Sequence, residues 1–267
     1  MSRKKDKTPQ VLEQISIVDF AAEAKCIAKV NEEVIFVQGA VAPGDIADLR
    51  ILRSKKKFKQ AQAINIQPLS THRTDVACAH FGVCGGCKWQ HVAYASQLAF
   101  KERQVRDNLT RIAKVALPEF QPILGSAHEY YYRNKLEFTF SSARWLTESE
   151  IGSEDLGSLH ALGFHVPGRF DKILEVSHCH LQPDPSNAIR NGVRTFAEAN
   201  KISFYELKMQ KEGALRNLII RNTVSGEWMV TVQFAYASDD EIQLMMRYLK
   251  ENFPMITSLN YVINQKG

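Results

Sequence analysis

Three of the five cysteines of this 267-residue chain stand within ten residues, from Cys78 to Cys87. Thiolates packed this closely repel one another unless a cation or a cluster neutralises them. Two adjacent glycines before Cys87 let the backbone bend tightly around a bound group. A fourth ligand is needed, and Cys179 is the candidate. The spacing therefore predicts a metal or cluster site with four ligands: Cys78, Cys84, Cys87 and Cys179.

The same four residues suit two kinds of site. Zinc accepts four cysteines or cysteine–histidine mixtures, and four histidines lie near the ligands in sequence: His80, His91, His178 and His180. A [4Fe–4S] cluster also binds four thiolates. Spacing alone leaves zinc and iron–sulfur open. The fifth cysteine, Cys26, lies on a predicted strand and is expected to be a core residue.

Composition and charge favour a cytoplasmic protein with no membrane contact. The chain is 45% apolar and 24% charged, and no apolar run approaches the roughly 20 residues of a membrane span. The basic start, Met1–Lys7, is not followed by the apolar core of a signal peptide. In a reducing cytosol, clustered cysteines favour a metal or cluster over disulfides.

Five short strands with turn residues between them are predicted before residue 68. Such a set is typical of a small closed barrel of the oligonucleotide-binding type. The basic run Arg53–Lys59 falls between the last two strands, and residues 1–75 hold +4 of the net charge of +5. Basic runs attract polyanions by releasing phosphate counterions; a solvated surface loop is the alternative. The strands are expected at 13–20, 25–30, 33–37, 45–52 and 60–66.

The predicted fold class is mixed: an all-β barrel followed by an α+β domain. We expect a polar leader at 1–10, the barrel at 11–68 and the α+β domain at 69–267. Periodic apolar residues predict one long helix at 93–114, with Leu98, Val105, Leu109 and Ile112 on its apolar face. Further helices are expected at 183–200, with Asn187, Arg190 and Arg194 facing solvent, and at 239–251. Strands are expected at 132–141, 159–165, 172–176, 202–210, 216–223, 228–235 and 258–264.

The cysteine segment, together with Tyr94, Gln97 and Lys101, resembles the signature of bacterial RNA (uracil-5-)-methyltransferases that carry a TRAM domain and a [4Fe–4S] cluster. The likeness is to the branch that acts on 23S ribosomal RNA. Tyr132–Lys135 resembles the family's Tyr-Arg-x-Lys element, and Leu162–Phe164 resembles its glycine–phenylalanine strand. One departure is the segment before Cys26, where the family has a Gly-x-Gly turn.

This resemblance implies that the four cysteines hold a [4Fe–4S] cluster, that the barrel is a TRAM domain and that S-adenosylmethionine is the methyl donor. It implies ribosomal RNA as the partner of a monomeric protein. Phe58 is a candidate base-stacking platform, with a packed residue at the barrel rim as the alternative. The expected RNA contacts are Arg53, Lys55, Lys56, Lys57, Phe58, Lys59, Arg133 and Lys135.

The family's chemistry needs a cysteine that adds to C6 of uracil and a carboxylate base. No cysteine follows Cys179 in the printed sequence, and no glycine-rich strand–turn–helix is recognisable. We therefore expect the C-terminal Rossmann-like methyltransferase domain to be absent, the helix at 93–114 to pack on it in the whole enzyme, and this RNA-recognition and iron–sulfur portion to be inactive alone. The alternative is a non-enzymatic RNA-binding module stabilised by a four-cysteine zinc or iron–sulfur site.

Overall fold

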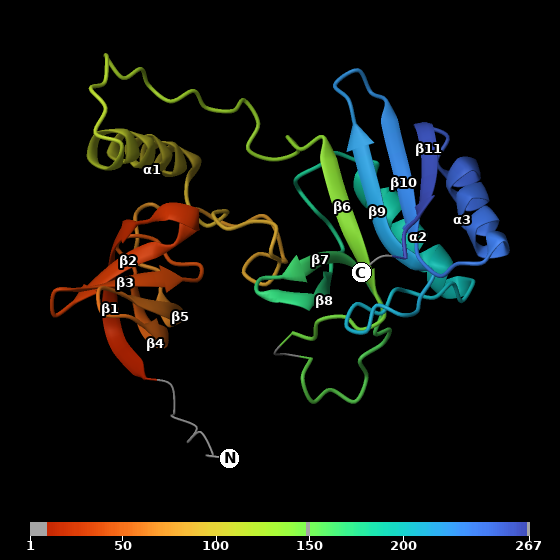
Figure 1. Ribbon diagram of the computed structural model, residues 1–267, viewed down its shortest axis with the longest axis horizontal. Coiled ribbons are helices and arrows are strands. Elements are labelled where there is room, and N and C mark those ends of the chain that lie inside the picture. Colours follow the sequence, from red (N-terminus) through yellow and green to blue (C-terminus); the bar gives the residue numbers. More distant parts are fainter. Residues whose placement is uncertain (1–9, 148–149, 266–267) are drawn as a thin grey trace. The chain divides into compact units, whose positions relative to one another are not determined.

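The computed structural model describes residues 10–147 and 150–265. Contacts group them into two compact units, between which the chain passes three times. The barrel unit holds the described residues up to 77 and residues 87–127; the sheet unit holds residues 78–86 and the described residues from 128 onward. Figure 1 shows both units. Most of the predicted leader, 1–9, lies outside the described residues, and the predicted domain boundary at 68 stays a prediction.

The barrel unit contains the five expected strands. They close in the order β1-β2-β3-β5-β4, with β3 and β5 parallel and the other described pairs antiparallel. The hairpin between β2 and β3 pairs Val30 with Glu33 across Asn31-Glu32, as the alternation predicts. The bounds are β1 (Val11–Phe20), β2 (Cys26–Val30), β3 (Glu33–Gln38), β4 (Ile46–Ser54) and β5 (Lys59–Gln67). The predicted barrel is confirmed.

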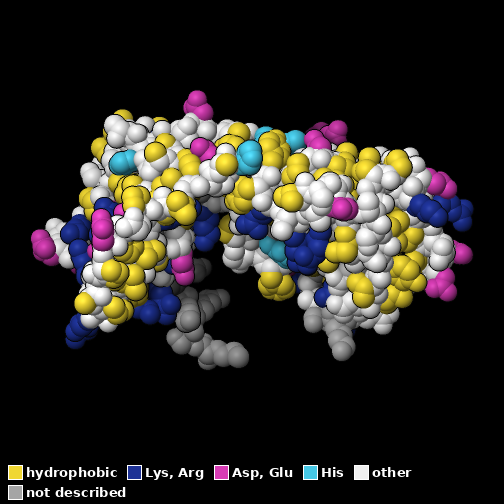
Figure 2. All heavy atoms as spheres, turned by 90° about the horizontal axis from the view of Figure 1, so that it is seen from above, with side chains coloured by type: hydrophobic (Ala, Val, Ile, Leu, Met, Phe, Trp, Pro, Cys, Tyr) yellow, Lys and Arg dark blue, Asp and Glu magenta, His cyan; other side chains and the backbone are white. Residues whose placement is uncertain are grey.

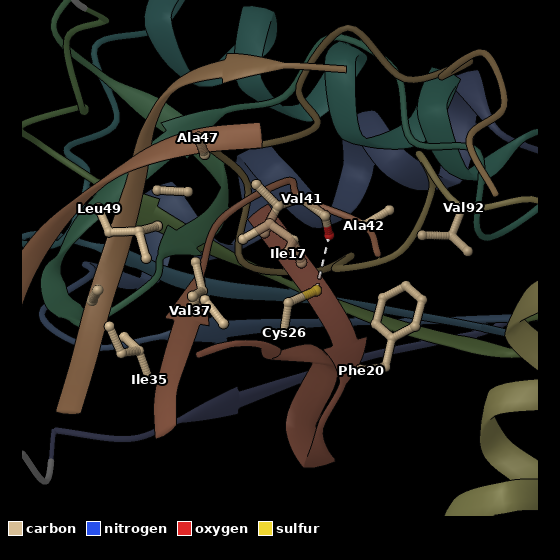
Figure 3. Packing of buried hydrophobic residues seen from close by; sticks show 13 residues of the cluster. Ile17, Phe20, Cys26, Ile35, Val37, Val41, Ala42, Ala47, Leu49 and Val92 are labelled. Atoms are coloured by element: carbon tan, nitrogen blue, oxygen red, sulfur yellow. Dashed lines mark hydrogen bonds between the residues drawn. The ribbon is translucent and has the colours of Figure 1, made fainter. Parts of the chain in front are cut away.

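The barrel core is built from alternate residues of these strands, and Cys26 lies within it (Figure 3). Its side chain is 1% exposed and its Sγ donates to the carbonyl of Val41 at 3.1 Å. Burial, with a smaller effect of the nearby Asp45 carboxylate, raises the pKa of the Cys26 thiol to about 12. The prediction that Cys26 is a core residue is confirmed.

The helix α1 (Tyr94–Asp107) ends earlier than predicted and continues as a π-helical turn, η2 (Asn108–Ile112). No residue of α1 or η2, all of which the structure describes, is buried. Val105 is 49% exposed and Ile112 77%. The predicted partial exposure of this apolar face is confirmed within the described residues.

The sheet unit is a six-stranded sheet in the order β11-β10-β9-β6-β7-β8. The helices α2 (Ser186–Ala199) and α3 (Asp239–Asn252) pack on one face through Ile189, Val193 and Met245, which are fully buried (Figure 1). A Ser238–Glu241 capping box starts α3. The strands are β6 (Lys135–Ser141), β7 (Ala161–Val166), β8 (Arg169–Glu175), β9 (Leu215–Asn222), β10 (Trp228–Phe234) and β11 (Ile256–Ile263).

One strand prediction for the sheet unit is wrong. Residues 202–210 were expected to form a strand, but only Phe204 makes a bridge, to Leu215. The expected strand, helix and strand at 228–235, 239–251 and 258–264 are confirmed as β10, α3 and β11. Because β10 and β11 are parallel and a helix connects them, they form a strand–helix–strand unit.

The surface carries charges of both signs. Lys and Arg, acidic and hydrophobic side chains are all visible at the surface in Figure 2. Within residues 10–147 and 150–265, no helix is both long and apolar enough to span a membrane.

Candidate functional site

The cysteine segment, residues 78–86, is a loop closed by its own backbone. The amide of Phe81 donates to the carbonyl of Cys78 at 3.1 Å, and the amide of Cys84 donates to that of His80 at 2.9 Å. The amide of Gly86 points at the Sγ of Cys84, 3.4 Å away. An amide N–H directed at a sulfur favours its thiolate form, so the loop is suited to holding a charged ligand atom.

This loop is attached to the end of β7. The amide of Gly85 donates to the carbonyl of His165 at 3.1 Å. A Cβ at Gly85 would lie 2.5 Å from that oxygen, whereas one at Gly86 would meet nothing closer than the Cys84 Sγ at 3.5 Å. Only the first of the two glycines is therefore required for this close approach.

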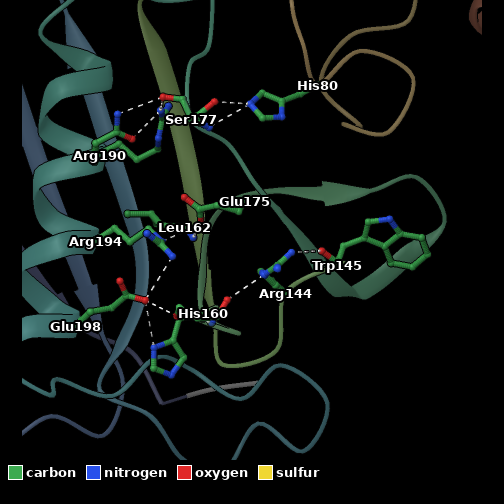
Figure 4. Close-up of polar contacts among 12 residues, drawn as sticks. His80, Arg144, Trp145, His160, Leu162, Glu175, Ser177, Arg190, Arg194 and Glu198 are labelled. Atoms are coloured by element: carbon green, nitrogen blue, oxygen red, sulfur yellow. Dashed lines mark hydrogen bonds and ion pairs between the residues drawn. The ribbon is translucent and has the colours of Figure 1, made fainter. Parts of the chain in front are cut away.

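A second attachment joins the loop to the segment before Cys179 (Figure 4). The amide of Ser177 donates to Nε2 of His80 at 3.0 Å, and the Ser177 hydroxyl lies 3.0 Å from the same nitrogen. Burial is the largest of the effects that lower the pKa of His80, followed by the charge of Arg190. The structure thus brings the segment carrying Cys78 and Cys84 next to the one carrying Cys179.

Cys179 itself is held by the second residue of α2. Its amide donates to Oδ1 of Asn187 at 2.8 Å, and Nδ2 of Asn187 donates back to its carbonyl at 3.2 Å. Asn187 is 5% exposed and Cys179 8%. The prediction that Asn187 faces solvent is wrong, because its side-chain amide is turned inward and bonds both backbone polar groups of Cys179 in this irregular segment.

Arg190, one turn further along α2, completes the network. Its Nη2 donates to the carbonyl of Ser177 at 2.6 Å, and its Nη1 to Oδ1 of Asn187 at 3.0 Å (Figure 4). Its guanidinium lies over the ring of Phe138, 5.1 Å from the centroid. Arg190 is 1% exposed, so its predicted solvent exposure is wrong; Arg194 is half-buried. No pattern in the sequence distinguishes Arg190 from a surface arginine.

The four predicted ligands remain a prediction. In the described ranges, no three Cys, His, Asp or Glu side chains form a group that could hold a metal ion. None of the five cysteines, all within the described residues, is in a disulfide, and Cys78, Cys84 and Cys87 are partly exposed. Their chemistry fits a soft metal or an iron–sulfur cluster, since thiolates suit both. Cys78, Cys84 and Cys179 belong to the sheet unit, and Cys87 follows Cys84 by three residues.

The predicted RNA contacts of the barrel unit lie on the turn between β4 and β5. The turn is closed by the amide of Lys55, which donates to the carbonyl of Phe58 at 2.9 Å. Phe58 packs edge-on against Phe36, with centroids 5.6 Å apart, and is half-buried. Lys59 forms an ion pair with Glu33. The exposed cations of this turn are Arg53, Lys55, Lys56 and Lys57.

The other two predicted contacts lie beside Cys179. Arg133 precedes β6, and its amide donates to the carbonyl of Leu181 at 2.8 Å, while the amide of Tyr131 donates to that of His180 at 2.7 Å. Lys135 is paired with Glu137 at 3.1 Å. The arginine of the Tyr-Arg-x-Lys element is thus exposed on a segment joined to the one that follows Cys179, which sequence spacing did not indicate.

A separate pocket of about 700 Å³ lies in the sheet unit. His160 stacks on Phe204 in its wall, with centroids 4.5 Å apart. Glu198, Glu206 and Glu212 also line it. This acidic lining is unsuited to RNA phosphates.

Comparisons with known proteins give the following likenesses. No family model matches the chain. An uncharacterized RNA methyltransferase of Bacteroides thetaiotaomicron is 51% identical over 92% of this chain and 55% of its own length. Another, of Porphyromonas gingivalis, is 43% identical over 94% of this chain and 55% of its own. The chain thus spans about half the length of the curated relatives it matches.

One solved structure has a similar fold. The crystal structure of Pyrococcus abyssi tRNA (uracil-54, C5)-methyltransferase in complex with S-adenosyl-L-homocysteine matches with a TM-score of 0.63 and 21% identity. The match covers 95% of this chain and 52% of that one.

These likenesses correct the predicted fold class. We expected the Rossmann-like methyltransferase domain to be absent from this chain. The fold of a methyltransferase instead matches nearly the whole chain, and its relatives are named RNA methyltransferases over the same extent. The parallel β10–α3–β11 unit agrees with this correction. The expectation that the chain is inactive for want of that domain is likewise unsupported.

Proposed function

We propose that this chain belongs to an S-adenosylmethionine-dependent RNA (uracil-C5) methyltransferase. The observation that carries the proposal is a fold match over 95% of the chain to a uracil-C5 methyltransferase, joined with relatives named RNA methyltransferases. The closed barrel with a cationic turn supports an RNA substrate, since such barrels bind oligonucleotides. We place the protein in the cytoplasm, as a monomer.

Within this class we propose 23S ribosomal RNA as the substrate and a TRAM domain as the role of the barrel. Support comes from the cysteine segment, whose signature resembles the 23S branch. Methylation at C5 of a structured uridine requires the base to leave its stack. The exposed cations Lys55, Lys56 and Lys57 would hold phosphates of the surrounding RNA, and Arg133 and Lys135 would do so from the sheet unit.

We further propose that Cys78, Cys84, Cys87 and Cys179 hold a [4Fe–4S] cluster. The residues fit such a group: all four are cysteines outside any disulfide, an amide points at the Cys84 sulfur, and the Cys179 backbone is fixed by Asn187. When bound, the cluster would join two segments far apart in sequence. The chain's own part is to orient the thiols and limit their contact with water.

No residue is assigned to S-adenosylmethionine. The turn from β10 to α3 is Ala235-Tyr-Ala-Ser238, without a glycine, and α3 opens with three acidic residues. This turn does not fit the glycine-rich form that lets a backbone approach a cofactor closely.

The proposed activity is tested by methyl transfer from labelled S-adenosylmethionine. In-vitro transcripts of 23S rRNA and of tRNA should be assayed with the chain printed here and with the protein at the full length of its relatives. We expect label in C5 of a 23S uridine. Label in the tRNA transcript alone would contradict the substrate, and no transfer by either protein would favour a non-enzymatic RNA-binding module.

The proposed cluster is tested by anaerobic purification with an absorbance scan and an assay of iron and sulfide. We expect a brown protein that contains both. A colourless protein with stoichiometric zinc would overturn the cluster in favour of zinc.

The proposed RNA surface is tested with two lysines of the same turn. Lys56 is exposed, whereas Lys59 is paired with Glu33. Lys56→Ala should weaken RNA binding and lower the slope of log affinity against log salt by about 0.7 to 0.9, the value of one phosphate contact. Lys59→Ala is the control and should change the slope less. Equal slopes for wild type and Lys56→Ala would contradict the contact.

A further inference from the structure

Arg190 is a buried cation without a carboxylate of its own. A charge removed from water is costly unless an opposite charge or hydrogen bonds compensate it. Within the described residues, Arg190 forms no ion pair, whereas Arg194 on the same helix pairs with Glu175 at 3.2 Å and Glu198 at 3.3 Å. Arg190 therefore differs from its neighbour in having no described carboxylate at ion-pair distance, and Glu175 and Asp184 act on it only at longer range.

The partners that Arg190 does have are neutral oxygens. They are the carbonyl of Ser177 and the side-chain amides of Asn187 and Asn191, the last at 3.0 Å. Its buried Nε has no hydrogen-bond partner in the described part of the chain. Buried polar groups are nearly always paired, so an unpaired donor in a buried guanidinium needs a reason.

Two of these partners hold the thiolate site. The carbonyl of Ser177 accepts a hydrogen bond from Arg190, and its amide donates one to His80 of the cysteine segment. Asn187 binds both Arg190 and the backbone of Cys179. Burial lowers the pKa of Arg190, and the negative charges of Cys179, Glu175 and Asp184, in decreasing order, oppose this.

We infer that Arg190 is the internal countercharge of the thiolate site at Cys179 and the positioning residue that joins this cysteine to the segment 78–86. The inference rests on the proposed cluster. Four thiolates and a [4Fe–4S] cluster would carry net negative charge, and Arg190 supplies a buried positive charge that forms no ion pair with a described carboxylate. Nearby charge and hydrogen bonds set the potential of such clusters.

Removing this charge should make the cluster harder to reduce, because reduction adds an electron to an already anionic group. It should also loosen the ligands. Changes in residues that orient metal ligands commonly cost on the order of 10- to 100-fold in affinity. The test compares Arg190→Met with Arg194→Met, a matched loss of one charge from the same helix. The measurements are the midpoint potential and the rate of iron loss to a chelator, both on anaerobically purified protein.

We expect Arg190→Met to have a more negative midpoint potential and to lose iron on the order of 10- to 100-fold faster than wild type, while Arg194→Met stays near wild type. Should Arg190→Met fail to fold, Arg190→Lys serves instead. It keeps the charge but not the forked geometry, so iron loss should be faster with little change in potential. Wild-type potential and iron retention in a folded Arg190→Met or Arg190→Lys would overturn the inference alone. A wild type without iron and sulfide would overturn the proposed cluster as well.

Discussion

The two units each contain a buried charge, and they compensate it differently. In the barrel unit, the carboxylate of Asp45 is fully buried and accepts bonds from Nε and Nη2 of Arg73, at 2.9 and 2.7 Å. The amides of Ala42 and Ser70 donate to it at 2.7 and 3.0 Å. In the sheet unit, Arg190 has only neutral oxygens. Within the described residues, the charge of Asp45 is therefore balanced by an ion pair in its own unit, whereas the charge of Arg190 is not.

The difference separates a structural role from a binding role. A buried charge whose partners are all in the chain stabilises the fold and has no need of a ligand. A buried charge whose hydrogen-bond partners are all neutral, and which has an unpaired donor, is only partly compensated by carboxylates at longer range and gains from an anion brought to it. The predictions below compare these two centres.

The largest effect is expected at Asp45. Replacing it with alanine leaves Arg73 and two amides without their acceptor, and breaking a buried ion pair costs about 3 to 5 kcal/mol of the free energy of unfolding. Urea unfolding followed by circular dichroism measures this. The control is Asp48→Ala, a surface carboxylate bonded to Gln14 and Asn65, which should be much less destabilising. A similar cost at both positions would contradict the structural role of Asp45.

Gly85→Ala should be next. The added Cβ would meet the carbonyl of His165 at 2.5 Å, so the cysteine segment must shift away from β7, at a cost of about 2 kcal/mol. Gly86→Ala is the control, because its Cβ would make only ordinary contact. The same urea measurement compares the two. If Gly86→Ala is as destabilising as Gly85→Ala, the attachment to β7 is not what fixes the loop.

Arg190→Met in metal-free protein should cost less than Asp45→Ala. It removes one of two donors from the carbonyl of Ser177, which keeps Asn191, and one of two from Oδ1 of Asn187, which keeps the Cys179 amide. The two lost bonds cost about 2 kcal/mol, but the substitution also removes a buried charge that forms no ion pair with a described carboxylate. Unfolding in the presence of a chelator isolates this effect. If Arg190→Met lowers the free energy of unfolding as much as Asp45→Ala does, Arg190 stabilises the fold as strongly as Asp45, which would contradict the proposed difference between the two buried charges.

The smallest effect is a pH dependence confined to the barrel unit. Burial alone would raise the pKa of Asp45, but the bonds from Arg73, Ala42 and Ser70 outweigh it and leave the pKa below the ordinary 3.8. A lowered pKa contributes stability above the ordinary value and loses it as pH falls through the lowered one. The difference in unfolding free energy between wild type and Asp45→Asn should therefore shrink on acidification from pH 6 to below pH 4. A constant difference would contradict it.

The barrel could be predicted from sequence because its signals are local. Alternating residues mark each strand, and Asn31-Glu32 marks the hairpin that the register confirms. Residues 202–210 show the limit of such patterns. Ile202 and Phe204 are buried, as the alternation suggests, yet the segment makes only one bridge. The reason is that, in the described part of the chain, the backbones of Ser203 and Tyr205 bond only to residues at the start of β9 and just after β6, and the segment does not continue along either strand.

The candidate site could be predicted only in its cysteines. Closely spaced thiols are a local pattern with few explanations, so the segment around Cys84 was identified at once. Asn187 and Arg190 were expected to face solvent, since polar side chains on a helix usually do. Their burial depends on Ser177 and Cys179 reaching the start of α2, a tertiary contact that residue spacing does not encode.

The threefold passage of the chain between the units has a consequence for its synthesis. Domains generally fold as units, starting from the N-terminus, as they leave the ribosome. Here the barrel unit is interrupted by residues 78–86, which belong to the sheet unit and emerge long before Ser177 and Cys179. The nascent chain must therefore keep Cys78 and Cys84 reduced while roughly a hundred further residues are translated. Exposure to oxidants is greatest during that interval, before the loop reaches its partners.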